Sequence, residues 1–256
     1  VMERALYNTV LGGMALDGKH FFYVNPLEVQ PKSLKFNHIY DHVKPVRQRW
    51  FGCACCPPNI ARLLTSLGHY IYTPREEALY INLYVGNQVE IPVGEKTLRL
   101  RISGDYPWRE QVKIVIESPS TVNHTLALRL PDWCEGPHIT LNGAPVTQDI
   151  RQGYLHIHHL WQEGDTLMLT LPMPVRRVYG NPLVRPQAGQ VALQRGPLVY
   201  CLEHADNGEA LHNLLLPRDA RFTVFEGKGL FARNMLIQAP GYRKHAENAD
   251  AQNLWS

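Results

Sequence analysis

From Ala78 onward the sequence alternates apolar and polar residues, and this period of two constrains the fold more than any other feature. Runs such as "TLRLRISG", "EQVKIVIES" and "DTLMLTL" place every second side chain on one face, with Gly, Pro, Asn and Asp turns between them. About ten such strands lie between Leu79 and Leu202. Short strands with one apolar face are typical of antiparallel sheets, so we expect one elaborated β-sandwich or two small ones.

Two helical patterns precede the strands. A four-residue spacing predicts a helix over residues 2–16, with one apolar face formed by Met2, Leu6, Val10 and Met14. Pro57 and Pro58 suit the first turn of a second helix, expected over residues 58–70, because their missing N–H groups would be unpaired there anyway. Two helices make a poor domain, and the chain opens at Val1 in helical periodicity, so we expect a piece of a longer protein.

Charge and hydropathy exclude several classes of function. The chain has 26 basic and 23 acidic residues, and no segment combines clustered Lys and Arg with aromatics, which argues against nucleic-acid binding. No apolar run approaches the roughly 20 residues that span a bilayer, and the first residues lack the pattern of a signal peptide. Five cysteines, an odd number, favour reduced thiols, so we expect no membrane partner and a cytoplasmic location.

Three of the five cysteines crowd into the stretch "WFGCACCPPNIARLL", as Cys53, Cys55 and Cys56. A redox pair is disfavoured because adjacent cysteines form a strained ring and redox motifs place two residues between their thiols. Thiolates are suitable ligands for zinc, but the remaining zinc ligands must then come from elsewhere. A nucleophilic thiol is a third alternative, since a helix N-terminus lowers the pKa of a nearby thiol. Packing as small apolar residues is the fourth.

Six segments, in this order, resemble the C-terminal part of one enzyme family: "ERALYNTVLGGMALDGKHFFYVNPLE", "CACCPPNIARLL", "DYPWREQVKIVIE", "LRLPDWCEG", "GDTLMLTLPMPVRRV" and "VALQRGPLVYCLE". The family is glycoside hydrolase family 127, the β-L-arabinofuranosidases, formerly a domain of unknown function. The resemblance implies a mixed, mainly β fold, in which the last helices of an (α/α)6 barrel are followed by antiparallel β-sandwich domains. It places the barrel end at residues 1–72, one β region at 73–187 and further strands with the tail at 188–256, with strands of the two β regions able to interleave.

The resemblance also implies a mechanism and a set of site residues. The family uses a zinc-bound cysteine as nucleophile in place of the second carboxylate of most retaining glycosidases. Cys55 matches this nucleophile and zinc ligand, and Cys56 matches a second zinc ligand. The other two ligands, a Glu and a Cys, and the acid/base Glu are expected upstream of this chain. Tyr23 resembles a tyrosine that contacts the sugar, and Glu3 a glutamate near the active centre.

Each remaining candidate has a structural alternative. Glu3 would otherwise be a solvated acid of the first helical turn, Tyr23 a core aromatic, and Cys53 a support of the loop without direct coordination. Loop histidines His38 and His42 could bind a sugar but are more typical of a surface. Three histidines in one strand are expected to split over its two faces as solvated residues: His156, His158 and His159. Packing residues are expected at Cys134 and Cys201, and sugar binding competes with packing for the aromatics of "DYPW" and "PDWC".

We therefore expect a retaining glycosidase that releases terminal β-L-arabinofuranose or a related sugar from an oligosaccharide or glycan, with Zn2+ as cofactor. Alone, this chain would lack the acid/base residue and be inactive. The alternative is a noncatalytic β-sandwich module that binds carbohydrate or serves a structural role. The sequence leaves the oligomeric state open, with a homodimer among the alternatives.

Overall fold

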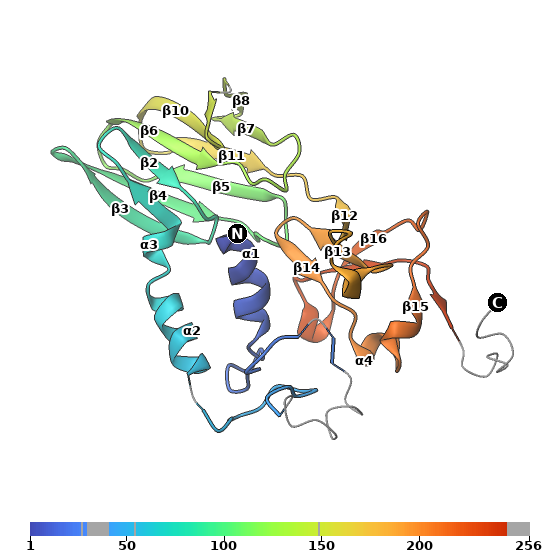
Figure 1. Cartoon of the computed structure of the whole chain (residues 1–256). Helices are drawn as coiled ribbons and strands as arrows, with labels where there is room; N and C mark the ends of the chain where they lie inside the picture. Colours follow the sequence, from blue (N-terminus) through green and yellow to red (C-terminus); the bar gives the residue numbers. More distant parts are fainter. Residues whose placement is uncertain (27, 30–40, 54, 148, 245–256) are drawn as a thin grey trace, which may run out of the picture. The chain divides into compact units, whose positions relative to one another are not determined.

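The structure is a computed structural model that describes residues 1–26, 28–29, 41–53, 55–147 and 149–244. The chain divides into two compact units (Figure 1). The first contains residues 1–174 with 196–199, and the second contains residues 175–195 with 200–256. No helix within the described ranges is long and apolar enough to cross a membrane.

The first helical segment departs from the expected geometry. α1 (Met2–Arg4) continues directly into η1 (Ala5–Val10), which is a π-helix. A π-helix closes its hydrogen bonds over five residues, so side chains spaced four apart do not stay on one face. Leu6 is buried as expected, but Met2 is 42% exposed and Glu3 is buried in its place. The expected apolar face is therefore wrong at Met2.

The second helix begins at the cysteines. α2 (Cys56–Thr65) carries both prolines in its first turn, which confirms that expectation. The helix expected over residues 58–70 is interrupted, because the hydroxyl of Ser66 donates to two backbone carbonyls and competes with the helical pattern. α3 (Gly68–Ile71) then leads directly into the first strand.

Two sheets form the sandwich of the first unit, which confirms the expected mainly β fold (Figure 1). The five-stranded sheet has the order β1-β2-β6-β10-β9, with β1 (Tyr72–Pro74), β2 (Ala78–Ile81), β6 (Val122–Arg129), β9 (Ile150–Arg151) and β10 (Tyr154–Trp161). The six-stranded sheet has the order β3-β4-β5-β11-β7-β8, with β3 (Asn87–Val93), β4 (Lys96–Ser103), β5 (Gln111–Ile116), β7 (His138–Leu141), β8 (Ala144–Pro145) and β11 (Thr166–Thr170).

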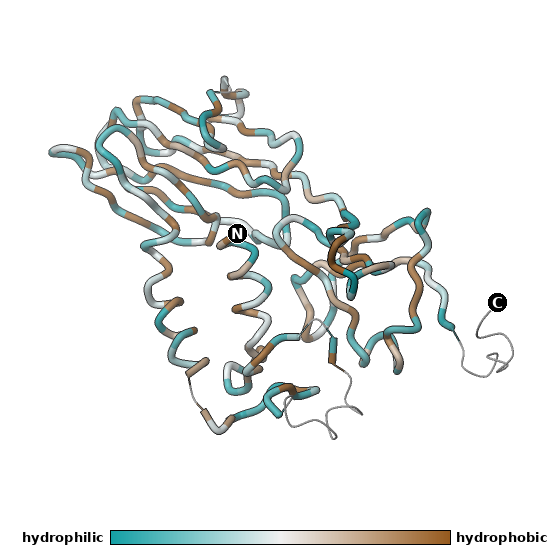
Figure 2. The backbone as a smooth tube through the Cα atoms, in the orientation of Figure 1, coloured by the Kyte–Doolittle hydropathy of each residue, from teal (hydrophilic) through white to brown (hydrophobic). Residues whose placement is uncertain are grey.

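Alternate side chains of the central strands are buried and form the core. Apolar and polar residues alternate along these strands (Figure 2), as the period of two requires. The fully buried members include Leu79, Ile81, Leu98, Leu100, Ile114, Ile116, Leu126, Leu128, Leu155 and Trp161. One pairing differs from the antiparallel expectation: β2 runs parallel to β6, because β3, β4 and β5 of the other sheet intervene between them in the chain.

The remaining strands of the described residues form three small sheets. Their strands are β12 (Val175–Tyr179), β13 (Val191–Arg195) and β14 (Leu198–Tyr200), then β15 (Leu214–Leu215) with β18 (Tyr242–Arg243), and β16 (Thr223–Glu226) with β17 (Met235–Gln238). Leu198 and Val199 of β14 group with the first unit, and the other strands lie in the second unit. Its short helices are η4 (Arg185–Gln187), α4 (His204–Asn207), η5 (Leu211–Asn213) and η6 (Gly229–Phe231). The main segment of the first unit ends at Pro174, and β12 pairs with β13 within the second unit. The expected domain boundaries at 72/73 and 187/188 stay a prediction.

The carboxylate of Glu3 ties the first helix to the sandwich. Its Oε1 accepts a hydrogen bond from Arg129 at 2.6 Å and another from the Tyr106 hydroxyl, and its Oε2 accepts from the Trp133 indole at 3.1 Å. Burial, followed by the Glu3 charge, raises the pKa of Tyr106 well above its usual value, so the hydroxyl keeps its proton and donates. Glu3 is only 6% exposed, and so the expected alternative of a solvated acid is wrong.

Replacing Glu3 should destabilise the first unit strongly. Glu3→Ala leaves Arg129, whose side chain is 21% exposed, without its buried partner, and such losses cost about 3–5 kcal/mol. Urea unfolding followed by tryptophan fluorescence measures the loss. The control is Asp132→Ala, which removes the ion pair between Asp132 and Arg4. The Asp132 side chain is 81% exposed, so we expect the free energy of unfolding to fall by less than about 0.5 kcal/mol. Equal losses of unfolding free energy in Glu3→Ala and Asp132→Ala would contradict this role of Glu3.

Candidate active site

Cys55 and Cys56 lie at the beginning of α2. Cys55 is the N-cap residue of the helix and Cys56 is its first residue. Cys55 is exposed and Cys56 is half-buried, and neither forms a disulfide. The two Sγ atoms are 3.9 Å apart, so both thiols face the same small volume.

The helix start offers few amide donors to these thiols. Pro57 and Pro58 have no N–H group. The N–H of Asn59 is directed to the carbonyl of Cys55, which also accepts from the Asn59 side chain at 2.9 Å. The sequence predicted that the helix N-terminus would lower the pKa of Cys55, but the prolines remove two of the N–H groups there. The helix dipole remains, and the hydrogen bonds that lower this pKa come mostly from side chains, with the smallest contribution from the Cys55 backbone.

The two adjacent thiols have pKa values shifted in opposite directions. Hydrogen bonds from the side chains of Cys53, Tyr23 and Cys56, in that order, lower the pKa of Cys55. Burial, followed by the hydrogen bond to Cys55, raises the pKa of Cys56. Paired groups whose pKa values are driven apart in this way ionise at different pH values. Cys55 is therefore the thiol that ionises first.

Tyr23 contacts both thiols. Its hydroxyl oxygen is 3.9 Å from the Cys55 Sγ, and its backbone carbonyl accepts from the Cys56 thiol at 3.9 Å. The hydrogen bond to Cys55, followed by the charge of Cys55, raises the pKa of Tyr23. The Cys55 thiol donates to the Tyr23 hydroxyl, and once Cys55 is ionised the protonated phenol would donate to the thiolate instead.

The end of the first helical segment supports the backbone next to Tyr23. The Phe22 N–H donates to the Gly13 carbonyl at 2.8 Å. Arg47 donates to the Gly12 carbonyl at 2.6 Å, and its guanidinium lies 4.7 Å from the centre of the Phe22 ring. Positive charge at the carboxyl end of a helix is favourable, so Arg47 stabilises the end of this segment. The same guanidinium packs on the Phe22 ring and restricts its movement.

The spacing of the two thiols fits a shared zinc ion. Two sulfurs at tetrahedral positions around zinc, each about 2.3 Å from it, are about 3.8 Å apart. The observed separation between Cys55 and Cys56 is 3.9 Å. Among the described residues, no group of three or more His, Cys, Asp or Glu side chains could hold a metal ion. These two cysteines thus fit half of a tetrahedral site.

Comparisons with known proteins agree along the whole chain. Residues 1–69 match the catalytic domain of GH127 β-L-arabinofuranosidases, residues 78–173 match the GH127 middle domain, and residues 175–252 match the family 127 C-terminal domain. The chain belongs to glycoside hydrolase family 127.

Individual relatives give the extent of the match. The non-reducing end β-L-arabinofuranosidase of Bifidobacterium longum subsp. longum is 36% identical, over 98% of this chain and 39% of its own length. The crystal structure of a GH127 β-L-arabinofuranosidase from Geobacillus stearothermophilus T6 is 47% identical, with a TM-score of 0.89 over 97% of this chain and 40% of that one. A GH127 β-arabinofuranosidase structure is 31% identical with a TM-score of 0.81. The family 127 chain described here spans about two fifths of the length of these relatives.

Glu3 lies with Tyr106 of "DYPW" and Trp133 of "PDWC". Both carboxylate oxygens of Glu3 already accept hydrogen bonds, from Tyr106, Trp133 and Arg129. Tyr106 and Trp133 therefore serve the interior of the sandwich unit, which was the structural alternative for these aromatics. Sugar contact by Glu3 stays a prediction, and the geometry gives this carboxylate a supporting role.

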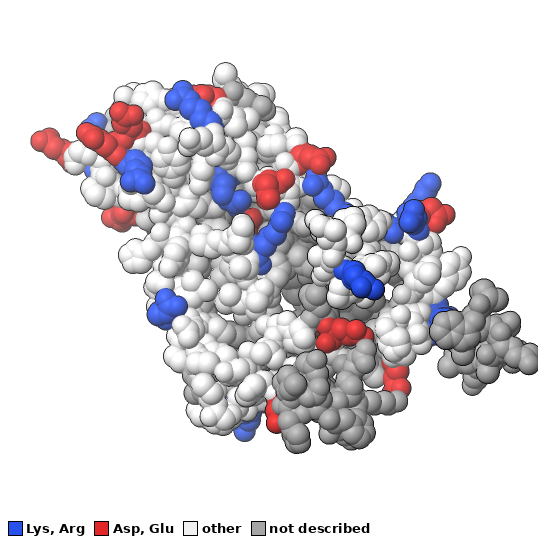
Figure 3. Space-filling model, viewed as in Figure 1, with Lys and Arg blue, Asp and Glu red and all other residues white. Residues whose placement is uncertain are grey.

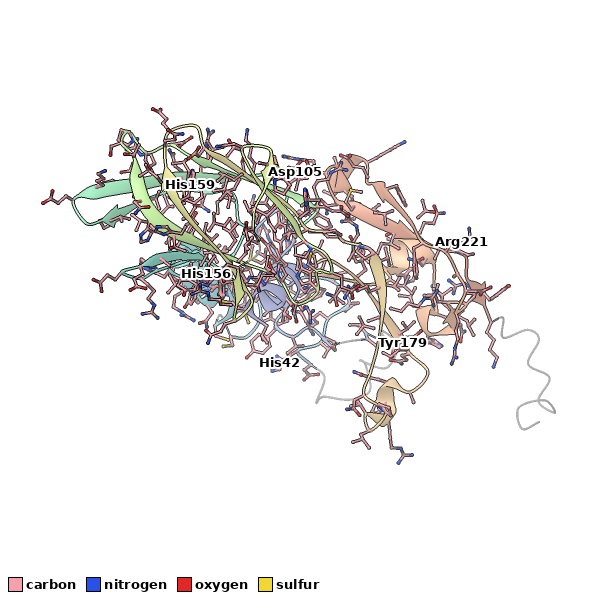
Figure 4. All side chains as sticks on the ribbon, turned by 90° about the horizontal axis from the view of Figure 1, so that it is seen from above. His42, Asp105, His156, His159, Tyr179 and Arg221 are labelled. Atoms are coloured by element: carbon pink, nitrogen blue, oxygen red, sulfur yellow. The ribbon has the colours of Figure 1, made fainter. Side chains whose placement is uncertain are left out.

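The histidines fall in separate places (Figure 4). His42 stacks on Tyr23, whereas His38 lies outside the described residues. On β10 the expected split of faces is confirmed. His158 is exposed and lies beside Thr125. His159 lies on the inward face, between Trp161 and the buried Asp165. Cys134 packs against the core cluster, as expected, but Cys201 is exposed and its expected packing role is wrong.

Two supporting residues escaped the sequence analysis. Arg129 reads as a polar residue at the end of strand β6, and Arg47 as one basic residue of an irregular loop. No local sequence pattern marks either residue, because Arg129 binds Glu3 and Arg47 binds Gly12, which are far away in the sequence. A proline pair after two cysteines was the only local signal for this site.

Alkylation should distinguish the thiols. At neutral pH, with a chelator present, iodoacetamide should modify Cys55 several times faster than Cys56, because Cys55 is exposed and more acidic. Peptide mass spectrometry of timed samples measures the rates, with the exposed Cys201 as an internal reference. Faster labelling of Cys56 would contradict the assignment.

Proposed function

We propose that this chain supplies the nucleophile and two zinc ligands of a retaining β-L-arabinofuranosidase. The observation that carries the proposal is the pair Cys55 and Cys56, one acidic and one less acidic, at a spacing that suits tetrahedral zinc. The substrate class is an oligosaccharide or glycan with a terminal L-arabinofuranosyl group at its non-reducing end, cleaved in the cytoplasm. Two relatives carry the names β-L-arabinofuranosidase and non-reducing end β-L-arabinofuranosidase, which supports the choice of sugar. We propose that the remaining catalytic residues correspond to the part of these relatives that this chain does not cover.

The reaction would proceed by two displacements. The Cys55 thiolate attacks the anomeric carbon and forms a C–S bond, while the glycosidic C–O bond breaks and a glutamic acid from the N-terminal part protonates the leaving oxygen. Water, deprotonated by the same glutamate, then attacks that carbon and returns the electron pair to sulfur. Two inversions at one carbon retain its configuration.

Residues of this chain prepare the thiolate for attack. Tyr23 donates its hydroxyl hydrogen to Cys55 and fixes the direction of the sulfur lone pairs. Cys56 and Cys55 would hold the zinc ion, which as a bound cation favours the deprotonated form of both thiols. Tyr23 would also meet the sugar bound beside Cys55, as its resemblance to a tyrosine of the family predicts.

Activity tests this proposal in two proteins. The extended protein, defined as this chain with the coding sequence that precedes Val1, should release p-nitrophenol from p-nitrophenyl β-L-arabinofuranoside. Cys55→Ala should lower kcat by at least about a thousandfold, whereas Cys201→Ser, at an exposed position, should leave it unchanged. This chain alone should release none. Turnover by this chain that depends on Cys55 would refute the need for upstream residues.

Zinc content is an independent test. The extended protein should bind about one zinc ion per chain, and Cys55→Ala or Cys56→Ala should abolish tight binding, since a structural or catalytic zinc site needs three or four protein ligands. Inductively coupled plasma mass spectrometry of the purified proteins gives the ratio, with Cys134→Ala as the control. A protein without zinc would favour the noncatalytic β-sandwich module instead.

A further inference from the structure

An exposed histidine covers the tyrosine that contacts the thiols. The imidazole of His42 stacks on the phenol of Tyr23, with ring centres 4.6 Å apart and planes inclined by 29°. Figure 4 shows His42 well apart from His156 and His159 of the sandwich. His42 is exposed, so the stack lies at the surface beside Cys55.

The Tyr23 ring is also supported from the interior. Phe51 is buried and lies 5.6 Å from the Tyr23 ring, and the buried Phe21 lies 5.1 Å from Phe51. Phe21 is itself fixed by two backbone hydrogen bonds with Gln48, both 2.9 Å long. His42 is therefore the exposed end of a row of aromatic rings whose inner members are held firmly.

The orientation of this ring decides where its hydroxyl lies. The Tyr23 oxygen is 3.9 Å from the Cys55 Sγ, near the limit of a hydrogen bond to sulfur, so a small rotation of the ring breaks the contact. Stacking partners restrict such rotation, and aromatic pairs of this kind contribute roughly 0.5–1.5 kcal/mol. The buried Phe51 restricts movement of the Tyr23 ring on its inner side. His42 restricts it on the side that faces solvent.

We propose that His42 is a positioning residue, which acts through Tyr23 to hold the phenol hydroxyl against the Cys55 sulfur. Its stacking contact, rather than any hydrogen bond or charge, carries this role. For catalysis the inference rests on the proposed function. For the reactivity of Cys55 it stands on the geometry of this chain alone.

Thiol labelling tests the inference in this chain without any need for turnover. Iodoacetamide rates at Cys55 are measured at a single pH, with a chelator, in the wild type, Tyr23→Phe, His42→Ala and the double variant. Loss of the hydroxyl contact should slow labelling about threefold in each single variant. In the Tyr23→Phe background His42→Ala should have no further effect, because the group that it positions is gone.

A conservative replacement separates stacking from other roles. His42→Phe keeps a flat ring and should label Cys55 at the wild-type rate. His42→Ala should leave the midpoint of urea unfolding unchanged, whereas a merely structural role of His42 would lower it. An unchanged rate in His42→Ala, equal slowing in both backgrounds, or failure of His42→Phe to restore the rate would each overturn the inference.

Kinetics of the extended protein provide the second measurement. His42→Ala should lower kcat about tenfold and leave KM within about twofold, because a misplaced nucleophile affects the chemical step more than binding. Zinc content should stay the same. An inactive wild type would refute the proposed function while the labelling result still decides the role of His42, and an active wild type with an unaffected variant would refute only the role of His42.

Discussion

The buried carboxylate of Glu3 is the interaction on which the first unit depends. It brings three donors from the sandwich, Arg129, Trp133 and Tyr106, onto the first turn of the N-terminal helix. A charge taken out of water is costly unless it is paired and hydrogen-bonded, and here both oxygens have partners. The site depends on this tie, because the far end of the same helical segment supports Phe22 through the Gly13 carbonyl, and Tyr23 follows directly. The sandwich is thus linked through one helix to the thiols.

Much of the architecture was predictable because its cause is local. Short strands with alternating apolar and polar residues must bury their apolar sides, and two sheets that face each other do so. The prolines of α2 likewise locate a helix start by their own chemistry. Charge scattered over the visible face agrees with the balance of basic and acidic residues in the sequence (Figure 3).

What escaped prediction depends on contacts between distant residues. The parallel pairing of β2 with β6 follows from the path of the chain through the other sheet, and no residue of either strand announces it. The burial of Glu3 depends on partners more than a hundred residues away. At the site, the motif located Cys55 and Cys56, but their pKa values differ because Cys53 and Tyr23 lower that of Cys55 and burial raises that of Cys56. Both effects depend on the folded loop.

The two prolines after the cysteines also affect how such a site changes during evolution. Backbone amides at a helix start are present whatever the side chains are, and a substitution rarely removes them. Here Pro57 and Pro58 leave that position nearly empty of amides, and the donors around Cys55 are the side chains of Tyr23, Cys53 and Cys56. Each of these can be replaced by a single codon change. The reactivity of this thiol is therefore open to stepwise adjustment by selection, while the helix that carries it stays the same.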